Sequence, residues 1–517
     1  MKTAIVIGGG HNGLIAAFYL AQSGVRPIVL EARDEIGGGA VTNELHPGFR
    51  VPALTHEVLL QARVVADMNL RRHGLELLDA PARICSLSAA GPLVIDADPR
   101  THARMSAFNR KDATAYPEFL KAVSRNASVL ASTFEYIPPR IDRPDAGDLW
   151  NLISMGRAFR KLGRRGGHQL LRWGPMPVAD LAGEWFEHDL VRATVVAPAL
   201  TGTMLGPRSA GSSLVLLLRQ AHRQLAAAFE LRAKGGPGAI TQALASAARE
   251  AGAELRLSSA VSEIVVSDGN VRGVVAGGHT LDADVVLSSA DPKTTLLNLI
   301  DPSALSPDFA GKVEHYRAAG TVAKVNLALS SLPSFGCSPE SLTGRILVAH
   351  DLDYLERAFD HAKYGEFSER PWLELTIPSL LDNSLAPAGA HVASVYVHYA
   401  PYALRAGWTD ASRNALLEAT LRVLEERATG FRAAVVGAQV ITPADLERDY
   451  RLAGGHIFHG ELALDQLFTM RPLLGHARYG TPIRGLYLCG GGTHPGGFMS
   501  GGSGRLAAKA ALNASEI

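Results

Sequence analysis

The glycine-rich turn near the N-terminus constrains the fold of this chain more than any other feature of the sequence. Residues 3–7 are a short apolar run rich in β-branched side chains, which is typical of a strand buried in a parallel sheet. The turn Gly8-Gly9-Gly10-His11-Asn12-Gly13 follows, and residues 11–23 have the apolar periodicity of a helix. Residues 27–30 make a second strand, so we predict a βαβ unit with a right-handed crossover.

Three glycines of this turn have the spacing of a dinucleotide-binding site. Gly8 allows the tight turn out of the strand, Gly10 lets the backbone approach a diphosphate, and Gly13 lets the helix pack closely on the strand. The diphosphate is expected on the free N–H groups at the start of the helix, where His11 and Asn12 lie. The alternative is a glycine-rich turn without a function.

A second glycine cluster follows the second strand, and it distinguishes FAD from NAD. Glu31 ends that strand, where its carboxylate can accept hydrogen bonds from a ribose. The glycines after it can return the backbone against the same diphosphate, which is typical of large two-domain flavoproteins. Because the sequence contains no second strand–GxGxxG–helix unit, we predict bound FAD and no separate NAD(P)H domain. The residues expected to contact FAD here are Ala32, Arg33, Gly38, Gly39 and Ala40.

The C-terminal part of the chain repeats the order of strand, glycine-rich loop and helix. Residues 485–489 predict the strand and residues 501–512 predict the helix. The start of that helix can direct N–H groups at the electron-rich edge of a flavin ring. The alternatives are a second phosphate loop and a simple turn. The loop residues expected near the flavin are Gly490, Gly491, Gly497, Met499 and Ser500.

The length of the chain and the order of its elements predict an interleaved α/β protein. A chain of 517 residues is longer than one hydrophobic core usually serves. We expect a discontinuous Rossmann-type FAD-binding domain made of residues 1–80, 233–302 and 474–517. A second, mixed-sheet and helical substrate domain is expected from a mostly helical region, residues 81–232, and a mixed α+β region, residues 303–473.

The composition argues against several classes of function. A net charge of +1 gives no reason to expect a nucleic-acid partner. The three cysteines, Cys85, Cys337 and Cys489, form no CxxC, which predicts reduced thiols and neither a dithiol redox pair nor a metal site. We expect no signal peptide and no membrane-spanning run. These observations predict a cytoplasmic protein that at most associates with a membrane surface, as a monomer or an oligomer.

Four stretches of the sequence together resemble the phytoene-desaturase superfamily, and the resemblance covers essentially the whole chain. They are residues 8–14, 234–238, 282–292 and 489–497. Within the superfamily, residues 455–472 are similar to two branches. One comprises the carotene ketolases built on the desaturase fold, and the other is pyridine nucleotide-disulfide oxidoreductase domain-containing protein 2.

The resemblance implies how FAD is held, and two departures limit what it implies. It places diphosphate contacts at both glycine clusters, the ribose at Glu31, the adenine near Val261 and the isoalloxazine ring at residues 491–500. Many members have an arginine where this chain has Gly39 and Ala40. Amine oxidases have an acid in the C-terminal loop, where this chain has only glycines, and this departure argues against amine oxidation.

The candidate catalytic groups are histidines in the segments expected near the flavin. His494 lies inside the C-terminal loop and His56 lies after the second glycine cluster, and either can act as a base or be structural. A structural role is the preferred interpretation of His459. Asp465 and Arg471 are interpreted as an ion pair between the domains. Because dehydrogenation at an allylic C–H needs no side-chain base, a site without an essential catalytic residue is a further alternative.

These observations predict an FAD-dependent oxidoreductase that dehydrogenates or oxidises a hydrophobic, lipid- or isoprenoid-like substrate. A hydride would pass to the flavin, and oxygen or a quinone would reoxidise it. The first alternative is a carotenoid desaturase or ketolase. The second is a flavin-binding regulatory or structural protein with little turnover.

One basic stretch, residues 150–173, predicts a surface that can face a membrane. Its cations alternate with aromatic and aliphatic side chains, a composition that suits docking on an anionic bilayer. Gly163, Gly166 and Gly167 are expected to interrupt the helix. The alternatives are a solvated basic loop and a contact between subunits. The cations are Arg157, Arg160, Lys161, Arg164, Arg165 and Arg172.

Overall fold

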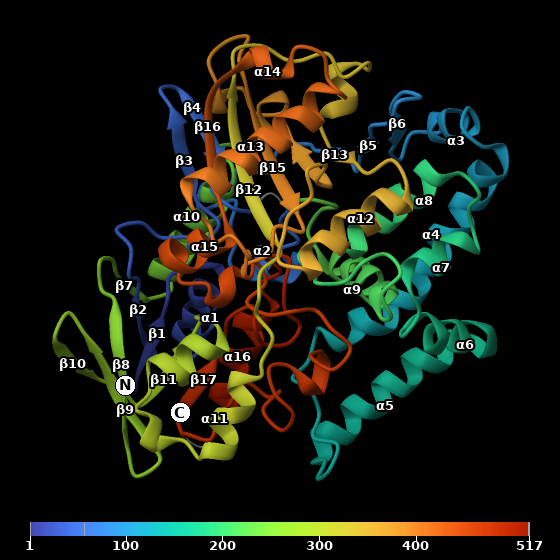
Figure 1. The fold of residues 1–517 in the computed structure, drawn as a ribbon. Coiled ribbons are helices and arrows are strands. Elements are labelled where there is room, and N and C mark those ends of the chain that lie inside the picture. The colour runs from blue at the N-terminus through green and yellow to red at the C-terminus, as the bar shows by residue number, and fades with distance from the viewer. Residues whose placement is uncertain (1, 56, 515–517) are drawn as a thin grey trace.

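The computed structural model describes residues 2–55 and 57–514. In Figure 1 a parallel sheet with its helices fills the lower left, a larger sheet fills the top, and a group of helices lies on the right. Strands from the start, the middle and the end of the chain build the parallel sheet. Among the residues described, we find no helix with both the length and the apolar character needed to cross a bilayer.

The first sheet consists of five parallel strands in the order β17-β11-β1-β2-β7. Its central strands are apolar and almost wholly buried, because both faces of the sheet are covered. The predicted βαβ unit is confirmed, since β1 and β2 flank helix α1 in sequence and pair in parallel. The strands are β1 (Thr3–Ile7), β2 (Arg26–Leu30), β7 (Glu254–Arg256), β11 (Val285–Ser288) and β17 (Leu486–Leu488).

Three helices cover one face of this sheet, and a small antiparallel sheet with one helix covers the other. The first core includes Leu14, Leu244 and Leu506, one from each helix. The second core joins Ile5 of the parallel sheet to Val274 of the small sheet. The helices of the first face are α1 (His11–Gln22), α10 (Pro237–Glu250) and α16 (Gly502–Asn513). The second face carries β8 (Val261–Ser267), β9 (Asn270–Ala276), β10 (His279–Asp282) and α11 (Pro307–Glu314).

The upper sheet has seven strands in the order β16-β12-β15-β14-β13-β5-β6. One face of it is apolar and packs on helix α13 (Asp410–Glu425). The opposite face carries buried polar side chains, among them Lys324 beside Tyr396 and Tyr396 beside Glu374 in the strand register. The strands are β5 (Ile84–Ser86), β6 (Leu93–Ile95), β12 (Val322–Leu329), β13 (Arg345–Val348), β14 (Leu373–Thr376), β15 (His391–His398) and β16 (Val435–Ile441).

The region expected to be mostly helical, residues 81–232, also contributes two strands to this sheet. Strands β5 and β6 are only three residues long each, too short to show a periodicity in the sequence. The helix break falls at Gly163, which has φ of +68°, whereas Gly166 and Gly167 lie within a helix. The helices are α3 (Arg100–Ser106), α4 (Arg110–Thr133), α5 (Ala146–Lys161), α6 (Gly163–Trp173), α7 (Val178–Gly183), α8 (Asp189–Val196) and α9 (Ser212–Leu225).

The remaining elements connect these layers. A two-stranded hairpin follows the second glycine cluster and lies against β12, β15 and β16. Helix α12 packs on α8. The elements are β3 (Thr42–His46), β4 (Phe49–Pro52), α2 (Ala62–Asp67), α12 (Leu352–Lys363), α14 (Phe431–Ala434) and α15 (Pro443–Tyr450).

Helices α1 and α16, from opposite ends of the chain, cross in close contact at a glycine. The Gly504 N–H donates to Asn12 Oδ1 at 3.2 Å. A Cβ at Gly504 would lie 2.2 Å from the Asn12 carbonyl oxygen, so no side chain fits there. The contact between the two ends of the chain therefore depends on this glycine.

We expect Gly504→Ala to lower the free energy of unfolding by about 1–3 kcal/mol, because the helices must separate to admit a methyl group. Urea denaturation measures the change. The matched control is Gly311→Ala in helix α11, where a Cβ would meet no atom within 4 Å. That control should be neutral or stabilising by up to about 1 kcal/mol. Equal stability of the two variants would contradict the close crossing.

Candidate functional site

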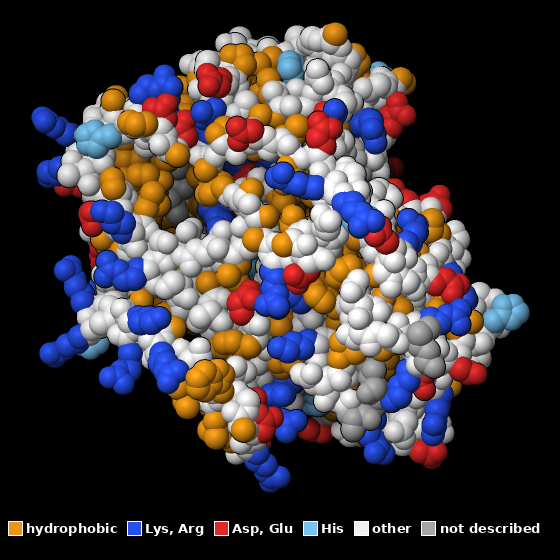
Figure 2. Space-filling view, turned by 180° about the vertical axis from the view of Figure 1, so that it is seen from behind, with side chains coloured by type: hydrophobic (Ala, Val, Ile, Leu, Met, Phe, Trp, Pro, Cys, Tyr) orange, Lys and Arg blue, Asp and Glu red, His pale blue; other side chains and the backbone are white. Residues whose placement is uncertain are grey.

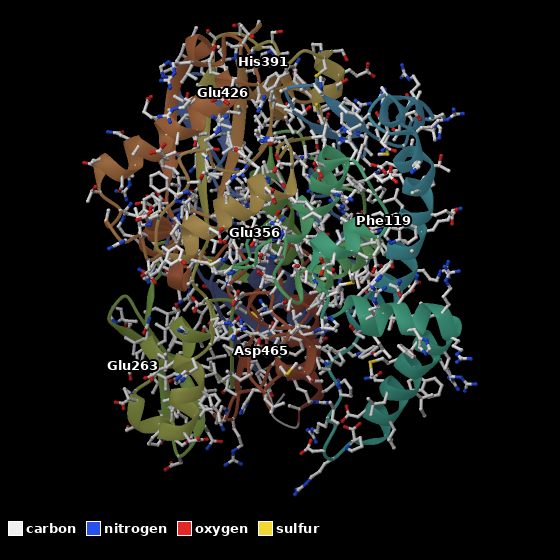
Figure 3. All side chains as sticks on the ribbon, turned by 45° about the vertical axis from the view of Figure 1, so that its right-hand side comes forward. Phe119, Glu263, Glu356, His391, Glu426 and Asp465 are labelled. Carbon is white, nitrogen blue, oxygen red and sulfur yellow. The ribbon has the colours of Figure 1, made fainter. Side chains whose placement is uncertain are left out.

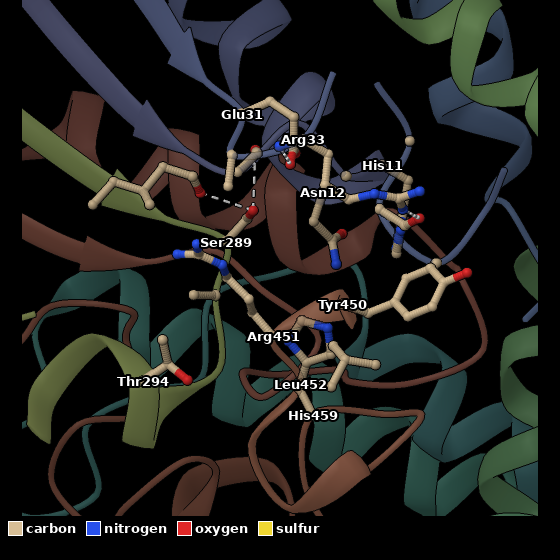
Figure 4. Close-up of a pocket in the computed structure, with 18 of the residues that line it drawn as sticks. His11, Asn12, Glu31, Arg33, Ser289, Thr294, Tyr450, Arg451, Leu452 and His459 are labelled. Atoms are coloured by element: carbon tan, nitrogen blue, oxygen red, sulfur yellow. Dashed lines mark hydrogen bonds between the residues drawn. The ribbon is translucent and has the colours of Figure 1, made fainter. Parts of the chain in front are cut away.

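A cavity opens at the carboxyl edge of the parallel sheet, where β1, β2 and β11 end (Figure 4). Ligands of open α/β sheets bind at this edge because the loops after the strands converge there. Ser289 and Ala290 line the cavity directly after β11; they lie in the stretch 282–292 of the resemblance but were not predicted to contact the cofactor. The predicted cofactor-binding residues that line it are Gly8, Gly10, His11, Asn12, Glu31, Ala32, Arg33, Gly38, Gly39, Ala40 and Val261.

The turn after β1 needs glycine because the backbone approaches its neighbours too closely for side chains. Gly8 has φ of +91°, and a Cβ there would lie 2.6 Å from Ser289 Oγ. A Cβ at Gly13 would lie 2.1 Å from the Gly8 carbonyl oxygen, which is the close packing of helix on strand that the sequence predicts. No side chain caps helix α1, so the N–H groups of its first turn are left for an anionic ligand.

Glu31 joins the two glycine clusters. Its Oε2 accepts a hydrogen bond from the Gly9 N–H at 2.7 Å, and its Oε1 accepts one from the Arg33 N–H at 3.0 Å. The Gly37 N–H donates to the Gly9 carbonyl at 3.0 Å, so the second cluster returns against the first. Because a carboxylate has about four acceptor positions, Glu31 retains acceptor capacity for ribose hydroxyls.

The second domain closes the cavity with five residues, of which the sequence analysis had singled out only His459. The Arg33 guanidinium lies over the Tyr450 ring, with 4.9 Å between the guanidinium carbon and the ring centroid. This contact brings the two domains together across the cavity. His459, for which we preferred a structural role, also faces the cavity (Figure 4). The lining residues from the second domain are Tyr450, Arg451, Leu452, Ile457 and His459.

Two uncharged histidines face this cavity. Burial, together with a smaller effect of the nearby His459, lowers the pKa of His11 to about 3. Burial also lowers the pKa of His459, and Arg471 adds to the effect although Asp291 opposes it. Both imidazoles are therefore neutral at pH 7 and can form hydrogen bonds without adding charge.

The C-terminal glycine loop lies beside this cavity. A Cβ at Gly490 would lie 2.4 Å from the Ser289 carbonyl oxygen, so the loop packs directly on the residues after β11. Gly497 packs against the Phe458 ring. That this loop contacts the isoalloxazine ring stays a prediction. The residues concerned are Gly490, Gly491, Gly497, Met499 and Ser500.

Arg471 holds the loop in place through a contact that differs from the predicted one. Its guanidinium is fully buried and donates five hydrogen bonds of 2.9–3.3 Å to backbone carbonyl oxygens of residues 458–466 and Gly491. The predicted ion pair with Asp465 is wrong, because Asp465 (Figure 3) pairs with Arg317 at 2.6 Å. The carbonyl oxygens compensate the burial of the Arg471 charge, which would otherwise be costly.

The two histidines predicted as catalytic have different outcomes. His494 is 2% exposed, and its Nε2 lies 2.9 Å from the Thr133 carbonyl oxygen between the rings of Phe134 and Phe468. Burial lowers its pKa to about 4. His494 is not among the described residues that line this cavity or the smaller one beside it. This geometry favours the alternative in which His494 orders the loop. His56 lies outside the described residues.

A second, smaller cavity adjoins the first and has mostly apolar walls. The two share His11, Leu54, Thr55 and Ile457, so a molecule in one lies next to a molecule in the other. Two aromatic rings of the second cavity meet with centroids 4.7 Å apart. The remaining lining residues are Glu57, Thr201, Tyr396, Phe458, Phe498 and Met499.

Glu57 is the one carboxylate in the described lining of the second cavity, and arginine guanidinium groups bind both of its oxygens. Arg219 Nε lies 3.0 Å from Oε1 and Nη2 lies 2.6 Å from Oε2, while Arg223 Nη2 lies 3.3 Å from Oε1. Burial alone would raise the pKa of Glu57, but Arg219, Arg345 and Arg223 lower it overall. The carboxylate thus stays ionised with its oxygens engaged, which does not suit a general base.

The residues of the first cavity fit FAD. The uncapped helix start and the glycine backbone suit a diphosphate, and the remaining acceptor capacity of Glu31 suits a ribose. FAD, when bound, supplies the ability to accept a hydride.

Comparisons with known proteins agree with this fit. The profile of the family described as flavin containing amine oxidoreductase matches residues 182–512, and that of an NAD(P)-binding Rossmann-like domain matches residues 6–67. Pyridine nucleotide-disulfide oxidoreductase domain-containing protein 2 of Rattus norvegicus is 36% identical over 98% of this chain and 92% of its own length. The lycopene-forming phytoene desaturase of Pseudescherichia vulneris is 26% identical over 97% of this chain and 96% of its own.

Solved structures show the same fold. An oxidoreductase from Methanosarcina mazei superposes with a TM-score of 0.64 at 15% identity, over 99% of this chain and 100% of its own. Together the comparisons confirm the resemblance to the phytoene-desaturase superfamily, the α/β fold class and FAD as the cofactor. They also confirm that the protein is an FAD-dependent oxidoreductase.

We expect Glu31→Ala to raise the Kd for FAD about 10- to 100-fold, because hydrogen bonds to a charged group contribute about 1.5–3 kcal/mol. Titration of the apoprotein, followed by quenching of flavin fluorescence, measures the Kd. The control is Glu263→Ala, which removes an exposed carboxylate of β8 (Figure 3) and should leave the Kd unchanged. Unchanged affinity of the Glu31 variant would contradict its assigned role.

Proposed function

The chain belongs to the flavin-containing amine oxidoreductase family, and from this premise we propose that it dehydrogenates or otherwise oxidises an apolar, lipid- or isoprenoid-like substrate. The observation that carries the proposal is the apolar cavity beside the cofactor cavity. Leu54, Ile457, Phe458, Phe498 and Met499 provide its walls. Such walls favour a hydrocarbon part of a substrate, because its burial removes apolar surface from water.

The polar groups of this cavity favour an oxidation that needs no side chain as a base. Guanidinium groups bind the oxygens of Glu57, and the Tyr396 hydroxyl donates a hydrogen bond to the Leu54 carbonyl at 2.9 Å. The His11 pKa of about 3 makes its imidazole a weak base. Hydride loss from an activated C–H, such as an allylic one, therefore suits this site better than deprotonation of the substrate by a side chain. Oxygen or a quinone is the proposed final acceptor.

Two alternatives remain distinct from this proposal. A carotenoid desaturase or ketolase is the narrower one, and the full-length similarity to a phytoene desaturase supports it. An FAD-binding protein with little turnover is the other. The glycines at 490–492 argue against amines as substrates, because this loop lacks the acid found in amine oxidases.

Anaerobic bleaching of the bound FAD tests the proposal. The holoenzyme is mixed with polyenes, unsaturated acyl chains and amines, and the absorbance of the oxidised flavin is followed. We expect apolar compounds with allylic C–H bonds to bleach the flavin, because only these offer an activated hydride donor that matches the cavity. Saturated compounds of equal length are the matched controls and should cause no bleaching.

Each result separates the alternatives. Bleaching by carotenes alone would favour the carotenoid enzyme. Bleaching by amines and by no apolar compound would contradict the proposal. If the protein is fully loaded with flavin and no compound bleaches it, the result would favour the FAD-binding protein with little turnover.

We also propose that the outer face of helices α5 and α6 docks on an anionic lipid bilayer. Leu149, Trp150 and Ile153 are 49%, 61% and 49% exposed, and their spacing places them on one face of α5. Arg157 and Arg160 continue the same face toward α6. Figure 2 shows Lys and Arg side chains gathered along the lower left edge, beside exposed apolar groups. An apolar strip next to clustered cations suits the interface of an anionic membrane.

We expect neutralisation of Arg160, Lys161, Arg164 and Arg165 to glutamine to weaken binding to phosphatidylserine-containing vesicles about 1000-fold, since each cation near such a surface contributes about 1 kcal/mol. Vesicle sedimentation measures the binding. The matched control replaces four exposed arginines elsewhere, Arg50, Arg71, Arg249 and Arg422, with glutamine and should bind like the parent.

Unchanged binding of the first variant would contradict docking through this face. Binding of the parent to pure phosphatidylcholine as tightly as to anionic vesicles would also contradict it. A change of oligomeric state in the first variant, without loss of vesicle binding, would instead identify the face as a contact between subunits.

A further inference from the structure

The structure brings together two cysteines that the sequence keeps far apart. Cys85 lies in β5, next to Ile346 of β13 in the strand register. Cys337 lies in the connection between β12 and β13, and both side chains belong to the same apolar core. Their thiols are in hydrogen-bonding contact, with Cys85 as donor. The absence of CxxC predicted no dithiol redox pair; in the structure two free cysteines lie together although no CxxC joins them.

Backbone contacts beside this pair hold the two segments against each other. The Arg345 N–H donates to the Arg83 carbonyl at 3.0 Å, and Arg83 Nη1 donates to Thr343 Oγ1 at 3.1 Å. A Cβ at Gly344 would lie 2.1 Å from the Arg83 carbonyl oxygen. The residues just before β5 are therefore packed against the residues just before β13, without space between them.

The two thiols differ in exposure and in acidity. Cys85 is fully buried, whereas Cys337 is half-buried between the exposed residues Gly336 and Ser338. The hydrogen bond from Cys85 lowers the pKa of the Cys337 thiol. The same hydrogen bond, together with burial, raises the pKa of Cys85 well above its ordinary range. Cys337 is thus the more reactive thiol, because the thiolate is the nucleophile and a reagent can reach it.

We propose that Cys85 and Cys337 are a redox modification site, at which a hydroperoxide converts the two thiols to a disulfide. This inference is independent of the proposed substrate. It rests on the hydrogen bond between the two thiols, on their place in one apolar core, and on the partial exposure of Cys337.

The chemistry needs one equivalent of hydrogen peroxide. The Cys337 thiolate attacks a peroxide oxygen, the O–O bond breaks, and a sulfenic acid forms as one water leaves. The Cys85 sulfur then attacks the Cys337 sulfur, the S–O bond breaks, and a second water leaves with the Cys85 proton. Two thiols lose two electrons in total, and the peroxide gains them.

The disulfide would join two parts of the second domain. Strand β5 also anchors the helical region to the sheet, since Thr194 Oγ1 of α8 donates to Ser86 Oγ at 2.8 Å. A covalent link from β5 to the connection after β12 would fix this anchor. Because the link closes a long loop of the chain, we expect the oxidised protein to melt at a higher temperature than the reduced one.

Peptide mapping of the holoenzyme tests the proposal. Reduced protein is treated with a small excess of hydrogen peroxide, alkylated and digested with trypsin. We expect the count of free thiols to fall from three to one, with a disulfide that joins the peptides 84–100 and 325–345. The thiol that remains free should be Cys489, which is fully buried.

Single variants make the outcome unambiguous. Cys489→Ser should form the same disulfide, whereas Cys337→Ser should keep Cys85 reduced. Cys85→Ser should yield a sulfenic acid at Cys337 that dimedone traps. If three thiols survive peroxide in the parent protein, or if peroxide oxidises Cys337 while Cys85 stays reduced, the proposal is wrong.

Discussion

The fold depends on the hydrogen-bonded pairing of β11 with β1 on one side and with β17 on the other. In the register of the sheet, Val286 lies between Ile5 and Leu486, so strands from the middle, start and end of the chain are neighbours. Because the strands are parallel, the loops after them meet at one edge. Ser289 occupies the centre of that edge, with Gly8 against its hydroxyl and Gly490 against its carbonyl. Residues from the start, the middle and the region 450–459 of the chain line the cofactor cavity, and the C-terminal loop packs beside them.

Buried charges hold the second domain against this edge. Arg471 binds five backbone carbonyls of two loops, and Arg345 of the upper sheet lies 2.6 Å from Glu230 and 4.0 Å from Glu57. Buried ion pairs add little net stability compared with apolar packing, but the loss of one partner is costly. The network therefore favours one arrangement of the domains. In the same arrangement, arginines bind the Glu57 carboxylate, so the second cavity has no free acid among its described residues.

The parts of the site that could be predicted are those in which chemistry and local structure coincide. Gly8, Gly13 and Glu31 have roles that follow from their distance along one βαβ unit, and the structure places them accordingly. Tyr450 lines the same cavity without any such signal, because packing between the domains brings it there, whereas His459 was expected near the flavin but was given a structural role. Strands β5 and β6 were missed because three residues do not establish a period and, unlike the equally short β17, they adjoin no glycine-rich loop. Arg471 was assigned the wrong partner because sequence proximity does not identify backbone acceptors.

By itself, the sequence determined that the protein is an oxidoreductase that uses FAD, since glycine spacing and strand–turn–helix order are local properties. Only the tertiary structure decided which residues close the cofactor cavity, that an apolar cavity adjoins it, and that Glu57 is occupied by arginines. It also brought Cys85 against Cys337. These contacts join residues far apart in the chain, and packing between sheets and helices sets them, which no local pattern encodes.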